Sequence, residues 1–384
     1  MDFSPTPEQE LLKEAVAGIA GHYGHEYFQE KTRQGAKPDE LWSELGAGGY
    51  LGVHLPSAYG GGGMGVAELT IVCEEVAAAG CPLLLMLVSP AICATLIARF
   101  GTASQKQRWL PPMASGEAKM AFAITEPDAG SNSHRIATTA VHEGGRWALY
   151  GTKHYISGVD EADAVIVVAR TGTEEATRRA RLSLFIVGTD AKGFEARKIP
   201  VEIAAPEKQF TIFLDDCTLG EDDLLGTEGE GLRQVFAGLN PERLMGAAIS
   251  CGIGRYALEK ASAYATHRTV WDRPIGAHQG IAHPLAVAKI ELELARLMLS
   301  KAAWSYDAGL DAGEAANMAK YAAAEASLRA LDQAIQTHGG NGLASEFGLA
   351  DLWGTARLLR TAPVSREMIL NYVAQHSLGL PKSY

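Results

Sequence analysis

The chain has 384 residues, of which 34 are basic and 45 acidic, giving a formal net charge of −11. This acidic balance excludes a protein held mainly on nucleic-acid phosphates, because such proteins present a basic surface. Hydrophobic residues make up 47% and charged residues 21%, as in ordinary globular proteins. At about 100–200 residues per domain, the length predicts two or three structural units.

The cysteines and apolar runs indicate the cellular compartment in which the protein is expected. Five cysteines, an odd number without a Cys-x-x-Cys pair, predict reduced thiols rather than a disulfide framework. No secretory leader precedes the first helical segment, so we expect a cytoplasmic protein. The longest apolar run, Cys81–Val88, is far shorter than the ~20 residues that span a bilayer, so no membrane span is expected. No metal site is predicted.

The first part of the chain is predicted to be helical. Thr6-Pro7-Glu8-Gln9 is typical of a helix start, with an N-cap hydroxyl, a proline at the first helical position and acidic residues in the first turn. A second helix is predicted through Trp42, and helical periodicity resumes over Glu68–Ala79 after a loop rich in proline and glycine. Residues 1–118 are therefore predicted to form an N-terminal α-helical domain.

The pattern changes after Met120. Short β-branched and aliphatic runs bounded by turn residues appear at Val165–Val168, Leu182–Val187 and Thr211–Leu214. These lengths suit strands better than helices. Residues 119–230 are therefore predicted to form a small middle β domain.

The last part is alanine-rich and again helical in pattern, and residues 231–384 are predicted to form a C-terminal helical domain. The expected helices cover Leu244–His267, His283–Asp307, Gly313–His338 and Ser365–Ala374. The fold class is thus mainly α with a β middle domain.

Two segments of the middle domain carry residues suited to ligand binding. Residues 121–132, AFAITEPDAGSN, place glycine- and alanine-flanked turn positions beside hydroxyls, which can bring backbone N–H groups close to a carbonyl or phosphate. A plain turn between domains explains the same residues. In Lys153–Ser157 an aromatic residue stands two positions before a hydroxyl, although an aromatic residue in a half-buried strand gives the same pattern.

Taken in order with four further motifs, these segments resemble the acyl-CoA dehydrogenase family over nearly the whole chain. Trp42, Leu45 and Pro56-x-x-Tyr59-Gly60-Gly61 match the N-terminal domain of that family. The six ordered motifs are Thr125-Glu126-Pro127 through Ser131, Gly151-x-Lys153 through Ser157, Asp215–Gly226 with Gly229-x-Gly231, Glu242-Arg243, Arg268-x-x-Trp271-x-x-Pro274-Ile275-x-x-x-Gln279, and Gln336-x-x-Gly339-Gly340-Asn341-Gly342.

The resemblance implies an α-helical N-terminal domain, a β-barrel-like middle domain and a C-terminal four-helix bundle. It implies an FAD-dependent acyl-CoA dehydrogenase that converts an acyl-CoA thioester to a trans-2-enoyl-CoA. The electron acceptor would be an electron-transfer flavoprotein, and the assembly a homotetramer. FAD would lie between the middle and C-terminal domains and across a subunit interface.

The family's cofactor-binding residues carry over to two groups here. Tyr155 would lie against the isoalloxazine and Ser157 would donate towards N5, where family members usually have tryptophan and threonine. Arg268 of a neighbouring subunit would pair with the pyrophosphate, although read alone it resembles a solvated helix charge. The residues expected to contact FAD are Phe122, Ile124, Thr125, Gly130, Ser131, Tyr155, Ile156, Ser157, Arg268, Trp271, Gln279, Gln336, Gly339, Gly340 and Ser365.

The reaction needs a base for the α-proton, and a desolvated carboxylate with a pKa near neutral suits this task. The family carries its glutamate either on the loop after the Gly-Gly-x-Gly helix or directly before the helix arginine. The loop position is Pro363 here, so Glu242 is predicted to be the base, oriented by Arg243. A first-turn helix carboxylate is the alternative for Glu242, and Glu367 is expected on a helix face.

Substrate contacts are expected from Ser131, Asn240 and Arg243. The Glu-Arg placement resembles the isovaleryl and long-chain dehydrogenases, which suggests branched, cyclic or long acyl chains.

Pro363 raises a second question. In the family the backbone N–H of this loop position helps to hold the thioester carbonyl, and proline has no N–H. Loss of such a donor typically costs ~2.7–4 kcal/mol of transition-state stabilisation. Either the register differs by one residue, another donor substitutes, or the α-proton is acidified less.

Two other functions are compatible with the sequence. One is a non-catalytic partner subunit that completes another chain's FAD site. The other is an oxygen-using flavin oxidase or monooxygenase on the same fold.

Overall fold

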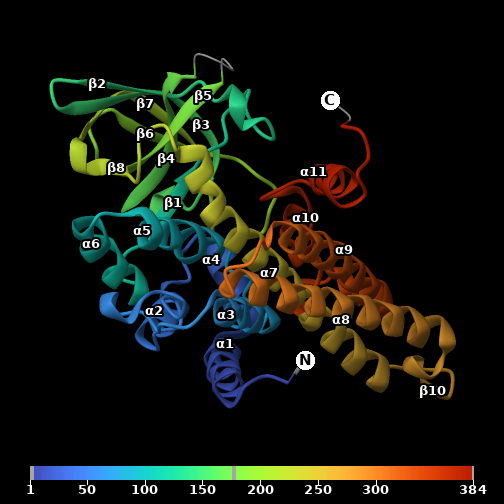
Figure 1. Ribbon diagram of the computed structural model, residues 1–384. Helices are drawn as coiled ribbons and strands as arrows, with labels where there is room; N and C mark the ends of the chain where they lie inside the picture. The colour runs from blue at the N-terminus through green and yellow to red at the C-terminus, as the bar shows by residue number, and fades with distance from the viewer. Residues whose placement is uncertain (1–3, 175–178, 383–384) are drawn as a thin grey trace.

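Three parts of the chain follow one another in the computed structural model, which describes residues 4–174 and 179–382. Figure 1 shows a group of N-terminal helices beneath a β-sheet, and a group of long C-terminal helices that extends away from both. The predicted fold class, helices then strands then helices, is confirmed.

The N-terminal part begins as predicted. Thr6 caps the first helix by accepting a hydrogen bond from the backbone N–H of Gln9, whose side chain reaches back to the Thr6 backbone. A π-helical segment, η2 (Ser89–Ala94), lies between the fourth and fifth α-helices. The α-helices are α1 (Pro7–Gln34), α2 (Asp39–Ala47), α3 (Val66–Ala78), α4 (Leu85–Val88), α5 (Thr95–Phe100) and α6 (Ala103–Ala114).

The middle part is an eight-stranded sheet in the order β6-β7-β3-β2-β4-β5-β8, with β1 pairing parallel to β4. The apolar run Val165–Val168 lies in β4, which is buried on both faces, and this explains why the run does not alternate. The strands are β1 (Met120–Ala123), β2 (Thr139–Glu143), β3 (Arg146–Ser157), β4 (Ala164–Thr173), β5 (Ala180–Gly188), β6 (Phe194–Ile199), β7 (Gln209–Gly220) and β8 (Leu224–Leu225).

As far as residue 382, the C-terminal part contains three long α-helices and two short ones. A small hairpin, β9 (Thr269–Val270) with β10 (Arg273–Pro274), joins the first two, and the short helix α10 is an element that the sequence analysis does not predict. The helices are α7 (Gly231–His267), α8 (Gln279–Asp307), α9 (Gly313–His338), α10 (Trp353–Thr361) and α11 (Arg366–Tyr372).

The predicted start of the first long helix, Leu244, is wrong, because α7 begins at Gly231 and runs through Pro241. Proline cannot donate to the carbonyl four residues earlier and normally breaks a helix. Here that carbonyl, on Ala237, accepts a hydrogen bond from the Tyr306 hydroxyl of α8 at 3.0 Å. The lost helical bond is replaced, so Glu242 lies inside a helix and is not a first-turn residue.

Helix α7 is the central element of the molecule. It packs against α3, α5 and η2 of the first part, against β5 of the sheet, and against α8, α9 and α10. Its approach to α3 requires glycine, because a Cβ on Gly252 would lie 2.4 Å from the Glu74 carbonyl oxygen. All parts of the chain therefore meet along the helix that carries Glu242.

Two general features complete the fold. All five cysteines are free and buried. Within residues 4–174 and 179–382, no helix combines the length and the apolar character that crossing a membrane requires. The division into domains at residues 118 and 230 stays a prediction.

Candidate active site

Glu242 is a half-buried carboxyl on α7. Within the described residues it forms no hydrogen bond or ion pair. Burial raises its pKa to about 8, although the charges of Arg243 and Lys320 pull in the opposite direction. A carboxyl that keeps its proton until near-neutral pH, and that forms no hydrogen bond or ion pair with another side chain, has the properties of a general base.

Arg243 is buried next to this carboxyl and bonds elsewhere. One of its amino groups donates to the Asn240 Oδ1 at 2.7 Å, while its Nε has no partner in the described part of the chain. Burial lowers its pKa and the neighbouring Glu242 counteracts this. Arg243 therefore acts on Glu242 through its charge. Two of the three residues predicted to contact substrate, Asn240 and Arg243, lie together on one helical turn.

Lys320 of α9 is a third ionisable group at this site, and the sequence analysis missed it. Its side chain is 1% exposed, and its ammonium donates to the carbonyl oxygens of Val364 at 2.5 Å and Arg360 at 3.4 Å. Burial lowers its pKa to about 8, whereas Glu242 raises it. The sequence does indicate that this lysine lies on a packed helix face, because Lys320 shares that face with the small residues Ala316, Ala324 and Ser327.

The loop before α11 contributes no carboxylate to the site. A Cβ on Gly246, one turn after Glu242, would lie 3.6 Å from Pro363 Cδ, so Pro363 packs beside the same turns of α7. Glu367 is exposed and pairs with Arg366, as expected for a helix-face residue. Ser365, predicted to contact FAD, caps α11 by accepting from the Met368 N–H at 3.3 Å.

The predicted flavin residues of the middle domain lie together. The backbone N–H of His154 donates to the Thr125 carbonyl at 2.8 Å, which joins the two motifs. The Tyr155 side chain is 58% exposed, whereas Ile156 beside it is buried. The Ser157 hydroxyl exchanges hydrogen bonds with the Gln209 side chain at 2.9–3.2 Å.

Backbone strain marks two of the predicted cofactor contacts. In the described residues, positive φ outside glycine occurs at Tyr155 (57°), Asp216 (51°) and Trp271 (63°). Such backbone conformations cost energy and concentrate at functional sites. Tyr155 and Trp271 are both predicted to contact FAD.

A buried ion pair fixes the loop that carries the remaining flavin residues. Lys153 is fully buried and its ammonium lies 2.8 Å from Glu126 Oε1 and 3.2 Å from the Ile124 carbonyl oxygen. The Glu126 carboxylate also accepts from the backbone N–H groups of Ala137 at 2.7 Å and Thr138 at 3.0 Å. Glu126 thus joins the two ends of the loop to each other and to Lys153 of β3, and Gly130 and Ser131 lie exposed between those ends.

The π-helical segment η2 connects this flavin wall to Glu242. The Cys93 thiol donates to the Ala121 carbonyl at 3.4 Å, and Ser89 Oγ accepts from the Met120 N–H at 3.1 Å, so η2 lies directly on β1. Burial and the nearby Glu242 raise the pKa of Cys93 well above its usual range. The segment η2 therefore packs against both β1 and α7, the helix that carries Glu242.

The other predicted FAD contacts form a separate cluster. The rings of Tyr264 and His338 stack with centroids 4.2 Å apart, and Asn341 Nδ2 donates to the Tyr264 hydroxyl at 3.1 Å. These contacts hold the end of α7 against the turn that follows α9. The exposed members of the cluster are Arg268, Trp271, Gln279, Gln336, Gly339 and Gly340.

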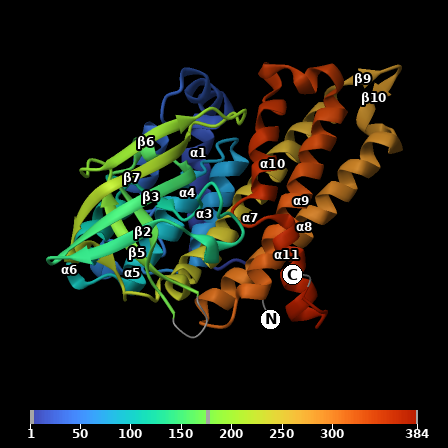
Figure 2. The same cartoon turned by 90° about the horizontal axis from the view of Figure 1, so that it is seen from above.

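This second cluster is remote from the first. In Figures 1 and 2 the β9–β10 hairpin lies at the far end of the long helices from the sheet. These two groups of predicted FAD contacts, called half-sites below, thus lie far apart in one chain.

The residues of both half-sites fit FAD. A Cβ added at Gly130, Gly339 or Gly340 would meet no atom within 4 Å, so backbone groups there are open to a ligand. Tyr155 and Trp271, the latter 92% exposed, offer aromatic faces for a flat ring system. Nowhere in residues 4–174 and 179–382 do three His, Cys or carboxylate side chains gather as metal ligands.

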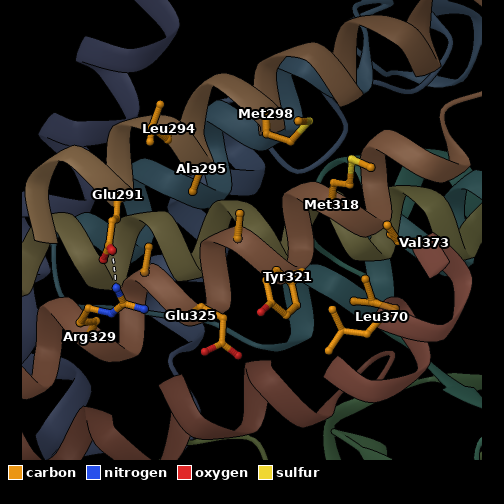
Figure 3. Close-up of a pocket in the computed structure, with 13 residues that line it drawn as sticks. Glu291, Leu294, Ala295, Met298, Met318, Tyr321, Glu325, Arg329, Leu370 and Val373 are labelled. Atoms are coloured by element: carbon orange, nitrogen blue, oxygen red, sulfur yellow. Dashed lines mark hydrogen bonds and ion pairs between the residues drawn. The ribbon is translucent and has the colours of Figure 1, made fainter. Parts of the chain in front are cut away.

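A groove of about 460 Å³ lies elsewhere, between α8, α9 and α11. Figure 3 shows Leu294, Met298, Met318, Tyr321 and Leu370 around it, with Glu325 and Arg329 towards one end. Its lining includes neither Glu242 nor any predicted flavin contact, so the groove lies apart from the candidate active site.

The fold defines a three-part enzyme whose central helix carries the half-buried carboxyl of Glu242, with the predicted flavin residues in the adjacent middle part. The chain matches the N-terminal, middle and C-terminal domains of acyl-CoA dehydrogenase at residues 6–117, 121–217 and 229–378. It is 58% identical to acyl-CoA dehydrogenase FadE12 of Mycobacterium tuberculosis (strain ATCC 25618 / H37Rv), over 100% of this chain and 99% of that protein.

Solved structures agree with these matches. A glutaryl-coenzyme A dehydrogenase in complex with glutaryl-CoA superimposes with a TM-score of 0.95 at 29% identity, covering 100% of this chain and 98% of the other. The glutaryl-CoA dehydrogenase of Mycobacterium smegmatis in complex with FADH2 gives 0.91 at 26% identity, covering 99% and 96%. The chain therefore belongs to the acyl-CoA dehydrogenase family of FAD-dependent oxidoreductases, as the sequence motifs predict.

Proposed function

We propose that this acyl-CoA dehydrogenase uses Glu242 as the base that removes the α-proton of its thioester substrate. The observation that carries the proposal is the state of that carboxyl, which is half-buried, free of any partner within the described residues, and has its pKa raised to about 8. The loop position that serves other members is Pro363, which has no ionisable group.

The overall change is α,β-dehydrogenation to a trans-2-enoyl-CoA. The α C–H bond breaks and its proton passes to a Glu242 oxygen, while the β C–H bond breaks with both electrons, leaving a carbon–carbon double bond. FAD, when bound, supplies the acceptor for that hydride. Burial of Glu242 keeps water from competing for the carboxylate, and the Arg243 charge favours its ionised form.

Several groups on this chain would hold the flavin and substrate. The Tyr155 ring would support one face of the flavin, and the Ser157 hydroxyl, oriented by Gln209, would donate to its N5. Thr125 and the open backbone at Gly130–Ser131 would hold its polar groups. Ser131, Asn240 and Arg243 would contact the substrate.

A second copy of the chain would complete each cofactor site. The cluster around Arg268 would hold the pyrophosphate and adenine side of the FAD bound by a neighbouring subunit. Helix α8 supports this assembly, because its exposed Val287, Ile290, Leu294, Leu297 and Trp304 follow one helix face. The stripe borders the groove of Figure 3, and we propose that it packs in a homotetramer.

The proposed electron acceptor is an electron-transfer flavoprotein, and the proposed compartment is the cytoplasm. Five buried, free thiols fit a reducing environment. The identity of the acyl group stays a prediction. The Glu-Arg placement predicts a branched, cyclic or long chain. A panel of acyl-CoA thioesters, scored by flavin reduction, identifies it.

Anaerobic bleaching of the flavin tests the proposal. The holoenzyme mixed with its preferred acyl-CoA loses flavin absorbance, and Glu242→Gln abolishes this change while FAD stays bound. Glu367→Gln is the matched control, because that carboxyl is exposed and pairs with Arg366 on the surface. Bleaching that persists in Glu242→Gln rejects the base. No bleaching of the wild type with any thioester favours a non-catalytic subunit, and peroxide release in air favours an oxidase.

A further inference from the structure

Lys320 is buried without a carboxylate ion pair. Within the described residues its ammonium bonds only to two carbonyl oxygens, those of Arg360 and Val364. Burying an ammonium costs several kcal/mol unless an opposite charge lies near it. Some other group must therefore offset the burial of this charge.

The carboxyls near Lys320 show which of them offsets its buried charge. Glu325 lies 2.7 Å from the Arg360 guanidinium and 2.9 Å from that of Arg366, so it is already neutralised. Glu367 on α11 is exposed and pairs with Arg366. Glu242 on α7 is the remaining carboxyl whose charge acts on Lys320, and no arginine bonds to it in the described residues.

The two carbonyls held by Lys320 flank Pro363 in the chain. Lys320, on α9, thus holds the loop whose Pro363 packs beside Gly246, one turn after Glu242 on α7.

We propose that Lys320 is a positioning residue that holds the Arg360–Val364 loop and stabilises the ionised form of Glu242. This proposal rests on the proposed function, in which Glu242 is the base. An opposite charge within about 4–6 Å favours the charged form of a carboxyl by about 1–3 pK units. Lys320 would thus convert a carboxyl that burial keeps protonated into one that is partly ionised near neutral pH.

The other groups that face Glu242 and Lys320 are accounted for. Arg243 on α7 acts on Glu242 in the same direction as Lys320 and stays in place in every variant below. Cys93 on η2 is neutral, because burial raises its pKa well above the usual range. Tyr372 on α11 acts on Arg243, and its own pKa is raised by burial, so it too is uncharged near neutral pH.

Three variants of the full-length holoenzyme separate charge from shape. Lys320→Met removes the charge and the hydrogen-bond donors, Lys320→Gln removes the charge and keeps a donor for the loop, and Lys320→Arg keeps the charge. The ionisation of Glu242 is followed by infrared spectroscopy as the carboxylic-acid band lost in the corresponding Glu242→Gln protein. The pH dependence of kcat/KM is measured in parallel.

The expected result is an upward move of the Glu242 midpoint by about one pH unit or more in Lys320→Met and Lys320→Gln, and little change in Lys320→Arg. Activity at pH 7 falls about tenfold for each pH unit moved. An unchanged midpoint in the two neutral variants, or an equal move in Lys320→Arg, overturns the proposal. If Lys320→Met does not fold, Lys320→Gln decides.

The infrared band separates this test from that of the proposed function. If Glu242→Gln stays active, the base assignment fails, yet the band still reports whether Lys320 stabilises the carboxylate. If the band moves as expected and Glu242→Gln is inactive, both proposals stand.

Discussion

Glu242 lies on α7 and Arg268 directly follows its last residue, so a rise of 1.5 Å per residue separates their backbones by about 39 Å along the axis. This separation supports the proposal that Arg268 contributes to the FAD site of a neighbouring subunit and not to the site beside Glu242 of its own chain.

Subunit complementation follows from this separation. Glu242→Gln and Arg268→Ala are each expected to be inactive alone, because each spoils every site of its own oligomer. When the two are co-expressed, a site that combines Glu242 of one chain with Arg268 of the other is intact. Random pairing restores about a quarter of wild-type activity. Acyl-CoA-dependent flavin reduction of the tagged hybrid measures it.

A control distinguishes shared sites from simple mixing. Tyr155→Ala lies in the same half-site as Glu242, so co-expression of those two variants leaves no intact site and restores nothing. Equal recovery from both combinations, or none from either, contradicts the two-chain site.

The Lys153–Glu126 ion pair gives a second prediction. Replacing either partner alone, as Lys153→Met or Glu126→Gln, leaves a buried group without its partner and is expected to cost about 3–5 kcal/mol. The double variant is expected to cost less than the sum of the two. Because Glu126 also holds the backbone at residues 137–138, each single variant should release FAD more readily.

Denaturant titration and flavin absorbance after gel filtration measure the two effects. The control is Glu195→Gln, which breaks the exposed pair with Arg197 and should change stability by less than about 1 kcal/mol. Single variants as stable as this control would show that the buried pair does not hold the loop.

Much of this organisation could be predicted from sequence, because local patterns determine it. The N-cap of α1 at Thr6, the strand at Val165–Val168 and the long alanine-rich helices each follow from neighbouring residues. The ordered motifs identify the family, since the spacing of Arg268, Trp271 and Gln279 does not depend on coordinates.

The features that could not be predicted from the sequence depend on contacts between residues that are far apart in the chain. The start of α7 was predicted too late because Pro241 ends helices locally, and the Tyr306 hydroxyl that replaces the lost bond lies on α8. The role of Lys320 could not be predicted either, because the loop carbonyls that it holds and the carboxyl of Glu242 come from distant parts of the sequence.

The raised pKa of Glu242 gives a prediction on stability. The folded protein keeps this proton up to about pH 8, whereas an unperturbed glutamate releases it near pH 4.5. Between these values the folded state binds more protons than the unfolded state, so the contribution of Glu242 to stability falls as pH rises. Glu242→Gln is therefore expected to be more stable than the wild type at pH 8.

The difference should be on the order of 4 kcal/mol at pH 8 and should vanish below about pH 4.5. Denaturant midpoints at a series of pH values measure it. Glu367→Gln serves as the control, because the pKa of that exposed carboxyl is lowered and its loss should not stabilise the fold. A wild type that equals Glu242→Gln in stability at pH 8 would show that the carboxyl is not desolvated.

The hydrogen bond from Tyr306 to Ala237 predicts a coupling with Pro241. Tyr306→Phe leaves the Ala237 carbonyl without a donor, at an expected cost of about 1–3 kcal/mol. In a Pro241→Ala background the new backbone N–H can donate to that carbonyl, so the same Tyr306→Phe change should cost markedly less. A double-mutant cycle by denaturant unfolding measures this coupling.

Activity provides the second readout of the same cycle. Because Pro241 precedes Glu242, a shifted turn at Ala237 moves the base, and Tyr306→Phe alone should lower kcat with little change in flavin content. The double variant should recover part of that loss, since the helical bond re-forms. Additive effects in both stability and kcat would show that the Tyr306 hydroxyl does not replace the bond that Pro241 removes.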